Sequence, residues 1–272
     1  MAERPNILYV FGDQMRASAL GCMGDEAVHT PHLDRLAGEG VLFRNGVANT
    51  PVCTPSRASL LTGRHAWTCG CIANDMRLPE EEQSNADVLK DEGYRSGYIG
   101  KWHLDGISRH TFTPPGRRRH GFDDYWAAYN CNHNYFDCKH YVNDSPELVR
   151  CDGYDADVQT GLAIDFMTQY RDEPFCLFLS WGPPHAPYRM APQEFLQRYP
   201  PEDIALRPNA LSADRAAIAG YYAQVTAIDQ DMGRLMAALD ELGLSENTIL
   251  VFSSDHGDML WSHALTKKQQ PW

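Results

Sequence analysis

The sequence predicts an α/β fold: a mostly parallel sheet flanked by helices on both faces. Three short apolar runs, at residues 6–11, 175–181 and 248–253, are typical of buried parallel strands. The segments between them have helical spacing, and strands that alternate with helices favour a parallel sheet covered on both sides. A chain of 272 residues is long enough for one large domain of this kind.

Four segments between the strands carry the signals of helices: 32–38, 85–92, 156–170 and 213–242. Thr30 and Pro31 supply an N-cap and a first-turn proline for the first of these helices. Gly93 ends the second. The last is the longest, and its apolar residues form a stripe that we expect to face the core.

Residues 104–150 interrupt this alternation and are predicted to form an insertion on the substrate side. They contain a basic run at 117–119 and a stretch in which two cysteines and two histidines lie close in sequence: Cys131, His133, Cys138 and His140. Such a cluster could bind zinc, but it lacks the paired Cys-x-x-Cys spacing of structural zinc sites. A substrate-side loop is therefore the favoured interpretation.

The charge balance limits the classes of partner. The chain has 24 Lys and Arg against 36 Asp and Glu, a formal net charge of −12, so it offers no basic excess for nucleic acid or an anionic membrane. No segment reaches transmembrane length, and the apolar run at 7–11 is too short for a secretory signal. Eight cysteines without a signal favour free thiols, and we expect a cytoplasmic protein.

The most specific motif surrounds a cysteine in the run Pro51-Val-Cys53-Thr-Pro55-Ser-Arg57-Ala-Ser-Leu-Leu-Thr-Gly63. The residues after Cys53 fit a tight turn into a helix whose N-terminus would face an anion. Arg57 supplies a fixed cation. A tyrosine-phosphatase loop would separate Cys and Arg by five residues, whereas three separate them here. A buried, inert cysteine is the remaining alternative.

Further polar residues follow predicted strands. Asp13 and Asp255 come after the first and last strands, which places two carboxylates at one edge of the sheet. The run 93–104 reads as a strand that presents Lys101, with His103 close behind. His185 lies in a Pro-Pro-His-Ala-Pro segment directly after another strand.

These motifs together resemble the formylglycine-dependent sulfatases, from Asn6 to Lys268. The resemblance implies an alkaline-phosphatase-like fold and hydrolysis of a sulfate monoester. In that family the cysteine, here Cys53, is oxidised by a maturing enzyme to formylglycine, whose aldehyde hydrates to a diol. One hydroxyl attacks sulfur and expels the alcohol; the other then loses its proton, so that the carbonyl re-forms and sulfate leaves.

The resemblance also implies a role for each matching residue. The implied metal ligands are Asp13, Gln14, Asp255 and His256. The implied catalytic residues are Cys53, Arg57, Lys101, His103 and His185. Lys268 and Asn74 are the implied substrate-binding residues, although the adjacent Lys267 leaves the register at Lys268 open. The implied ion is calcium, with manganese or magnesium as alternatives.

Two positions depart from the usual sulfatase pattern. Many sulfatases have aspartate where Gln14 stands and asparagine where His256 stands. The combination found here is similar to phosphonate and phosphate monoester hydrolases of the same superfamily, so such an ester is the alternative to a small-molecule or carbohydrate sulfate ester. Because relatives continue after the lysine element, we also expect residues 1–272 to be a catalytic domain without its C-terminal subdomain, and an inactive fragment is a further alternative.

Overall fold

The structure is a computed structural model that describes residues 4–24, 27–210 and 212–269. Its strands are β1 (Asn6–Asp13), β2 (Arg95–Lys101), β3 (Tyr125–Tyr129), β4 (Cys138–Val142), β5 (Leu148–Cys151), β6 (Phe175–Pro184) and β7 (Thr248–Ser254). Its α-helices are α1 (Pro31–Glu39), α2 (Cys53–Thr62), α3 (Asn85–Asp91), α4 (Asp155–Gln169), α5 (Gln193–Leu196) and α6 (Arg215–Glu241).

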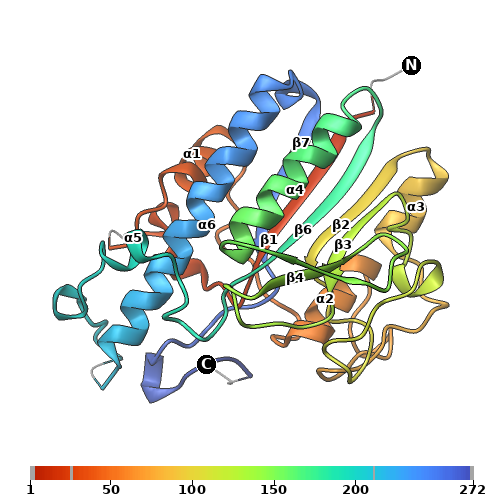
Figure 1. The fold of residues 1–272 in the computed structure, drawn as a ribbon. Coiled ribbons are helices and arrows are strands. Elements are labelled where there is room, and N and C mark those ends of the chain that lie inside the picture. Colours follow the sequence, from red (N-terminus) through yellow and green to blue (C-terminus); the bar gives the residue numbers. More distant parts are fainter. Residues whose placement is uncertain (1–3, 25–26, 211, 270–272) are drawn as a thin grey trace.

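All seven strands form one sheet in the order β5-β4-β3-β2-β6-β1-β7 (Figure 1). Five strands run parallel to one another: β3, β2, β6, β1 and β7. At the other edge, β4 pairs antiparallel with β3, and β5 pairs antiparallel with β4. The parallel registers are regular: Leu8 of β1 lies between Leu177 of β6 and Leu250 of β7. The predicted mostly parallel sheet is therefore confirmed.

Helices cover both faces of the sheet. α4 and α6 lie side by side on one face, with α1 against α6, and α2 and α3 lie on the other (Figure 1). Alternate residues of β1 contribute to separate hydrophobic cores: Leu8 and Val10 pack under α4 and α6, whereas Phe11 belongs to the core on the α2–α3 side. This alternation follows from the two-residue period of a strand.

The predicted helices and strands match the structure except in the insertion. Each of the four predicted helices lies within two residues of an observed one, at α1, α3, α4 and α6. Residues 104–150 also contain β3, β4 and β5, which extend the sheet and which the sequence did not predict. β4 and β5 are short and mix charged with apolar residues, whereas β3 is apolar but only five residues long, too short to be told from a buried loop.

Within the residues that the structure describes, no helix is long and apolar enough to cross a membrane.

Candidate active site

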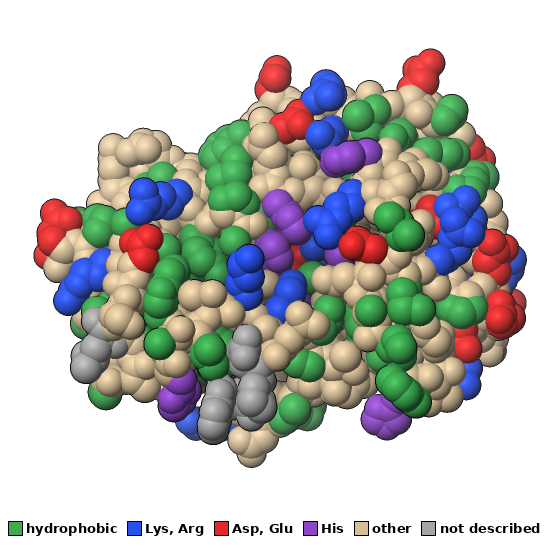
Figure 2. Space-filling model, turned by 90° about the horizontal axis from the view of Figure 1, so that it is seen from below, with side chains coloured by type: hydrophobic (Ala, Val, Ile, Leu, Met, Phe, Trp, Pro, Cys, Tyr) green, Lys and Arg blue, Asp and Glu red, His purple; other side chains and the backbone are tan. Residues whose placement is uncertain are grey.

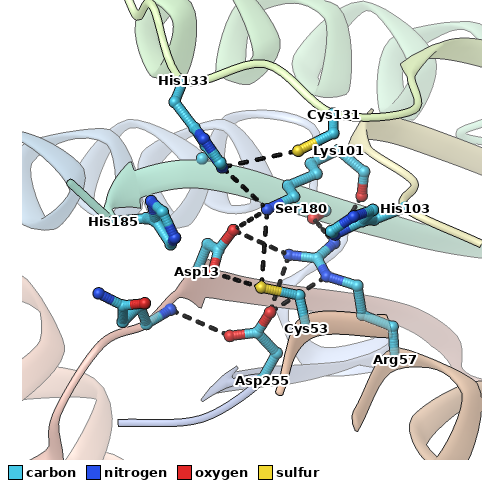
Figure 3. A network of polar contacts seen from close by, with 12 residues as sticks. Asp13, Cys53, Arg57, Lys101, His103, Cys131, His133, Ser180, His185 and Asp255 are labelled. Atoms are coloured by element: carbon cyan, nitrogen blue, oxygen red, sulfur yellow. Dashed lines mark hydrogen bonds and ion pairs between the residues drawn. The ribbon is translucent and has the colours of Figure 1, made fainter. Parts of the chain in front are cut away.

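The carboxyl ends of the parallel strands converge on the N-terminus of α2. Asp13 is the last residue of β1 and Lys101 the last of β2, while His185 and Asp255 directly follow β6 and β7. Cys53 is the first residue of α2. Figure 3 shows these side chains pointing toward one another. On the face of the molecule that lies at the bottom of Figure 1, histidine, lysine and arginine side chains gather near the middle (Figure 2).

The thiol of Cys53 is the centre of this group. Its Sγ lies 2.9 Å from Lys268 Nζ, 3.3 Å from His256 Nε2, 3.6 Å from Asp13 Oδ1 and 3.8 Å from Lys101 Nζ. The residue is 1% exposed. A group at this position is thus reached by two ammonium groups and lies at the positive end of a helix.

Arg57, one turn along α2, is fully enclosed by acceptors. Its guanidinium contacts Asp255 Oδ2 through Nε and NH2 at 3.1 and 3.0 Å, and NH1 donates to the Lys101 carbonyl and to Ser180 Oγ at 2.6 and 2.7 Å. NH2 also lies 3.7 Å from Asp13 Oδ2. A buried guanidinium held by these contacts is a fixed part of the site, and here it orients both carboxylates.

Opposite charges balance one another in this buried cluster. Burial alone would raise the pKa of Asp13, but Lys101, whose ammonium donates to Oδ2, and Arg57 hold this pKa well below its usual range. Burial and Asp13 also oppose ionisation of Cys53, yet Lys101 and the His256 hydrogen bond outweigh them and lower the thiol pKa. The site therefore favours a negative charge at position 53.

Four side chains are placed to hold a metal ion. Ligand atoms of Asp13, Cys53, Asp255 and His256 all lie within 4.8 Å of one another. His256 Nδ1 lies 3.0 Å from the Gly257 carbonyl, which can only accept, so Nδ1 carries a proton and Nε2 faces the carboxylates. Burial opposes the charged form, but Asp255 and Cys53 raise the pKa of His256, and a bound cation would take the place of the proton at Nε2. An imidazole oriented in this way is typical of metal-ligating histidines.

Gln14 supplies a further oxygen. Its side chain is buried, Nε2 donates to Asp258 Oδ2 at 2.5 Å, and Oε1 has no hydrogen-bond partner among the described residues. Its backbone N–H donates to Asp255 Oδ1 at 3.0 Å. An unpartnered buried amide oxygen is costly unless a cation or water satisfies it. The residues present therefore fit a hard divalent cation bound by two carboxylates, an amide oxygen and an imidazole.

Two histidines stack at the open side of the site. The rings of His133 and His185 are 4.0 Å apart and nearly parallel, and His133 Nε2 lies 3.3 Å from Lys101 Nζ. Burial, with Lys101 nearby, lowers the pKa of His133 to about 2. Burial also lowers the pKa of His185 to about 4. Both rings are therefore neutral at neutral pH in the absence of a bound anion.

The His103 side chain contacts Asp75 and not the Cys53 thiol. Its Nε2 lies 3.0 Å from Asp75 Oδ1, and its backbone carbonyl accepts from Thr54 Oγ1 at 2.8 Å. Burial, together with Lys101, lowers the pKa of His103 to about 3. Within the described residues no hydrogen bond joins His103 to Cys53, so its expected contact with the nucleophile is not present in this geometry.

The two residues expected to bind substrate occupy different positions. Lys268 Nζ lies 2.9 Å from Cys53 Sγ and 3.2 Å from His256 Nε2, so the structure places the Lys268 side chain beside the thiol. Asn74 instead accepts a hydrogen bond from the Thr54 backbone N–H at 3.0 Å. Asn74 thus satisfies one free N–H at the start of α2.

Four further residues support the site and were not among the predicted site residues: Asp75, His133, Ser180 and Asp258. Ser180 lies in a central strand, where an isolated serine carries no sequence signal. The sequence indicates His133 only as one member of the Cys131–His140 cluster. Its position near Lys101 depends on a loop that no local pattern predicts.

That cluster is divided in the structure. Cys131 and His133 belong to the active site, where Cys131 Sγ lies 3.6 Å from His133 Nε2. Cys138 and His140 lie on β4 and group with Cys151 of β5. The four residues therefore do not form one metal site, because the chain turns between them.

Comparison with known proteins places this geometry in a family. The sequence model of the sulfatase family matches residues 5–272. The chain is 45% identical over 277 residues to the ulvan-active sulfatase of Formosa agariphila, with 99% of this chain and 54% of that protein covered. It is 31% identical to human N-acetylgalactosamine-6-sulfatase, with 96% and 51% covered. The chain thus spans about half the length of these relatives.

Solved structures agree on the fold. The yidJ protein of Bacteroides fragilis superposes with a TM-score of 0.88 at 32% identity, covering 96% of this chain and 63% of that one. The phosphonate monoester hydrolase of Agrobacterium radiobacter superposes with a TM-score of 0.78 at 20% identity, covering 99% and 66%. The predicted alkaline-phosphatase-like fold is therefore confirmed.

Proposed function

The chain belongs to the sulfatase family, and we propose that it hydrolyses a sulfate monoester with a formylglycine at position 53 as nucleophile. One observation carries the proposal. The side chain at position 53 lies at the N-terminus of a helix, within 3.8 Å of two lysine ammonium groups and of the group of metal-ligating side chains. This is the arrangement that a nucleophile needs in order to attack an anionic ester.

Two groups supply chemistry that unmodified side chains lack. Formylglycine would offer two hydroxyls on one carbon, one to attack sulfur and one to release sulfate by re-forming the carbonyl. A divalent cation, calcium in first place and manganese or magnesium as alternatives, would polarise the ester and favour the ionised hydroxyl. Asp13, Gln14, Asp255 and His256 would hold that cation.

The remaining residues would bind the sulfate group and orient the side chains around it. Lys268 and Lys101 would hold the sulfate oxygens over position 53, with Lys101 itself fixed by Asp13. Arg57 would keep Asp13 and Asp255 in place and offset their charge. His185, neutral before binding, gains affinity for a proton when an anion enters beside it, which suits it to donate to the leaving oxygen.

The surroundings support an anionic carbohydrate as the alcohol part. A cavity of about 230 Å³ opens beside Cys131, between residues 109–110 and the β4–β5 ribbon. Arg109, Lys139 and Arg150 bring positive charge to its lining, and Tyr129 and Tyr141 bring aromatic surface. A sulfated saccharide presents both further anions and apolar sugar faces. A formylglycine-generating enzyme would be the protein partner.

A phosphonate or phosphate ester is the second candidate. It is favoured by Gln14 and His256, which lie at the candidate metal site where many sulfatases have aspartate and asparagine. Measuring kcat/KM for nitrophenyl sulfate, nitrophenyl phosphate and a phenyl phosphonate on one preparation separates the candidates. We expect the sulfate ester to be preferred, and a clear preference for either phosphorus ester would replace the proposal.

A matched pair of variants tests the nucleophile. Cys53→Ala should abolish turnover of nitrophenyl sulfate. Cys53→Ser should also lose turnover while accumulating a sulfated serine, since serine lacks the second hydroxyl that expels sulfate. Retention of the parental sulfatase rate by Cys53→Ala would contradict the proposal.

A further inference from the structure

A second group of potential metal ligands lies on the β4–β5 ribbon. In the antiparallel register Cys138 pairs with Cys151, and His140 pairs with Val149, two residues away from Cys151. Residues two apart on a strand share a face, as do directly paired residues. All three side chains therefore point to one side, and their ligand atoms lie within 4.8 Å of one another.

The histidine in this group is buried. His140 is 4% exposed, and among the described residues its imidazole lies with the thiols of Cys138 and Cys151. Burial alone lowers its pKa, so the ring is neutral. A buried imidazole is costly unless its nitrogens are satisfied, and a metal ion would satisfy one of them. Neutral imidazole is also the form that binds metals.

We propose that Cys138, His140 and Cys151 bind one Zn²⁺, with solvent as the fourth ligand. Two thiolates and an imidazole suit zinc, whereas the carboxylate-rich site around Asp13 suits a hard cation. Cys138 is 1% exposed, but Cys151 is only half-buried, at the end of an exposed edge strand. The group is thus enclosed from the core side and open to a water molecule on the other.

The obvious rival is a disulfide between the two paired cysteines. Cys138 and Cys151 are directly opposite across the strands, but both are free thiols in this structure. A disulfide would use two of the three side chains and would leave out the buried His140. Zinc accounts for all three.

The ion would link β4 and β5, which form the edge of the sheet near the active site. β5 has four residues and pairs with β4, so it is weakly held. β4 directly follows the 130–137 loop, which carries His133 to its stack with His185. Tyr135 in that loop donates to the carbonyls of Gly182 and His185. Zinc would therefore stabilise the ribbon and, through it, the loop, and this role does not depend on which ester is cleaved.

The test uses the full chain carrying Cys53→Ala, which removes the thiol that lies among the candidate metal ligands of the active site. After purification with reductant and dialysis against Zn²⁺, we expect one equivalent more of tightly bound zinc, by elemental analysis, than in the same protein carrying Cys151→Ser, because the site around Asp13 is the same in both. Replacing zinc by Co²⁺ should give thiolate-to-cobalt charge-transfer absorption. Because a thiol must lose its proton to bind zinc, binding should release protons and weaken as the pH falls.

Three variants on this background decide the assignment. Cys151→Ser, on the exposed edge, should abolish the charge-transfer band or shift it strongly, and His140→Ala should weaken zinc binding by about 100-fold or more. Cys22→Ser, a half-buried cysteine outside the ribbon, should leave both unchanged. Circular dichroism establishes that each variant is folded.

Two results would overturn the proposal. One is a Cys138–Cys151 disulfide that persists in reductant, found by peptide mass spectrometry, with no zinc retained. The other is zinc or cobalt binding that is unaffected in folded Cys151→Ser and His140→Ala proteins.

Discussion

Two buried aspartates in this molecule, Asp13 and Asp231, behave in opposite ways. In the active site Asp13 is completely buried, yet Lys101 and Arg57 hold its pKa well below the usual range. Between α4 and α6, Asp231 is 1% exposed, faces Asp157 and has Arg234 as its cation. Burial, together with the Asp157 charge, raises the pKa of Asp231 to about 8.

The pKa values of Asp13 and Asp231 differ because of the cations beside them and not because of the depth of burial. Arg234 is 41% exposed and contacts one oxygen of Asp231, whereas Arg57 is enclosed and contacts Asp255 twice. A carboxylate that is ionised inside a protein needs cations fixed at close range. The candidate active site provides them through Lys101 and Arg57, which keep Asp13 ionised although it is buried.

Of the variants considered, removal of a cationic side chain from the active site should have the largest effect, and this effect is on kcat/KM. Lys101→Ala should lower kcat/KM for a sulfate ester by about 100-fold or more, because a positioned charge in a dry site is worth about 3 kcal/mol. Lys90→Ala removes an exposed lysine that pairs with Asp123 and is the matched control, with an unchanged rate expected. Steady-state kinetics on both variants decide the matter; equal rates would show that Lys101 does not act on the ester.

Metal removal comes next. Because Asp13 and Asp255 converge with His256, chelation should lower the melting temperature as well as the rate. Restoring calcium at about 100 times its dissociation constant should return roughly 3 kcal/mol of stability. Asp255→Ala should show no such response in calorimetry. If neither chelator nor calcium changed the melting temperature of the parent protein, the proposed metal site would be wrong.

Asp231, between α4 and α6, should make stability depend on pH. With its folded-state pKa raised to about 8, Asp231 binds a proton that the unfolded chain has lost above about pH 4. The stabilisation is thus complete below about pH 4 and is lost as the pH rises toward 8, by at most about 1.4 kcal/mol per pH unit. Asp231→Asn should flatten this slope in denaturant titrations, and exposed Asp165→Asn should not. The same slope in both variants would contradict the assigned cause.

The smallest effect concerns a neutral hydrogen bond inside the charged site. Asn74→Ala removes the acceptor for the Thr54 N–H at the start of α2, so stability should fall by about 1 kcal/mol. Asn74→Asp should restore most of it, since a carboxylate caps the same N–H. Chemical denaturation measures the loss. A large rise in KM without any loss of stability would instead assign Asn74 to the substrate, as the sequence first indicated.

The central part of the site could be predicted because it follows the strands. Asp13, Lys101 and Asp255 end or follow apolar strands, and the carboxyl ends of parallel strands must meet. The Cys53 motif is local and begins a helix. By contrast, His133 and the Cys138–Cys151 pairing depend on β3, β4 and β5. β4 and β5 have no apolar run, and the register of such short strands is set by contacts distant in sequence.

The central claim is that position 53 carries the nucleophile as formylglycine. Peptide mass spectrometry of residues around Cys53, after co-expression with a formylglycine-generating enzyme, tests it directly, with the nitrophenyl sulfate rate measured on the same preparations. We predict an aldehyde in place of the thiol, with a rate that rises in proportion to the fraction converted. A preparation with an unmodified Cys53 thiol and a full sulfatase rate would contradict the account.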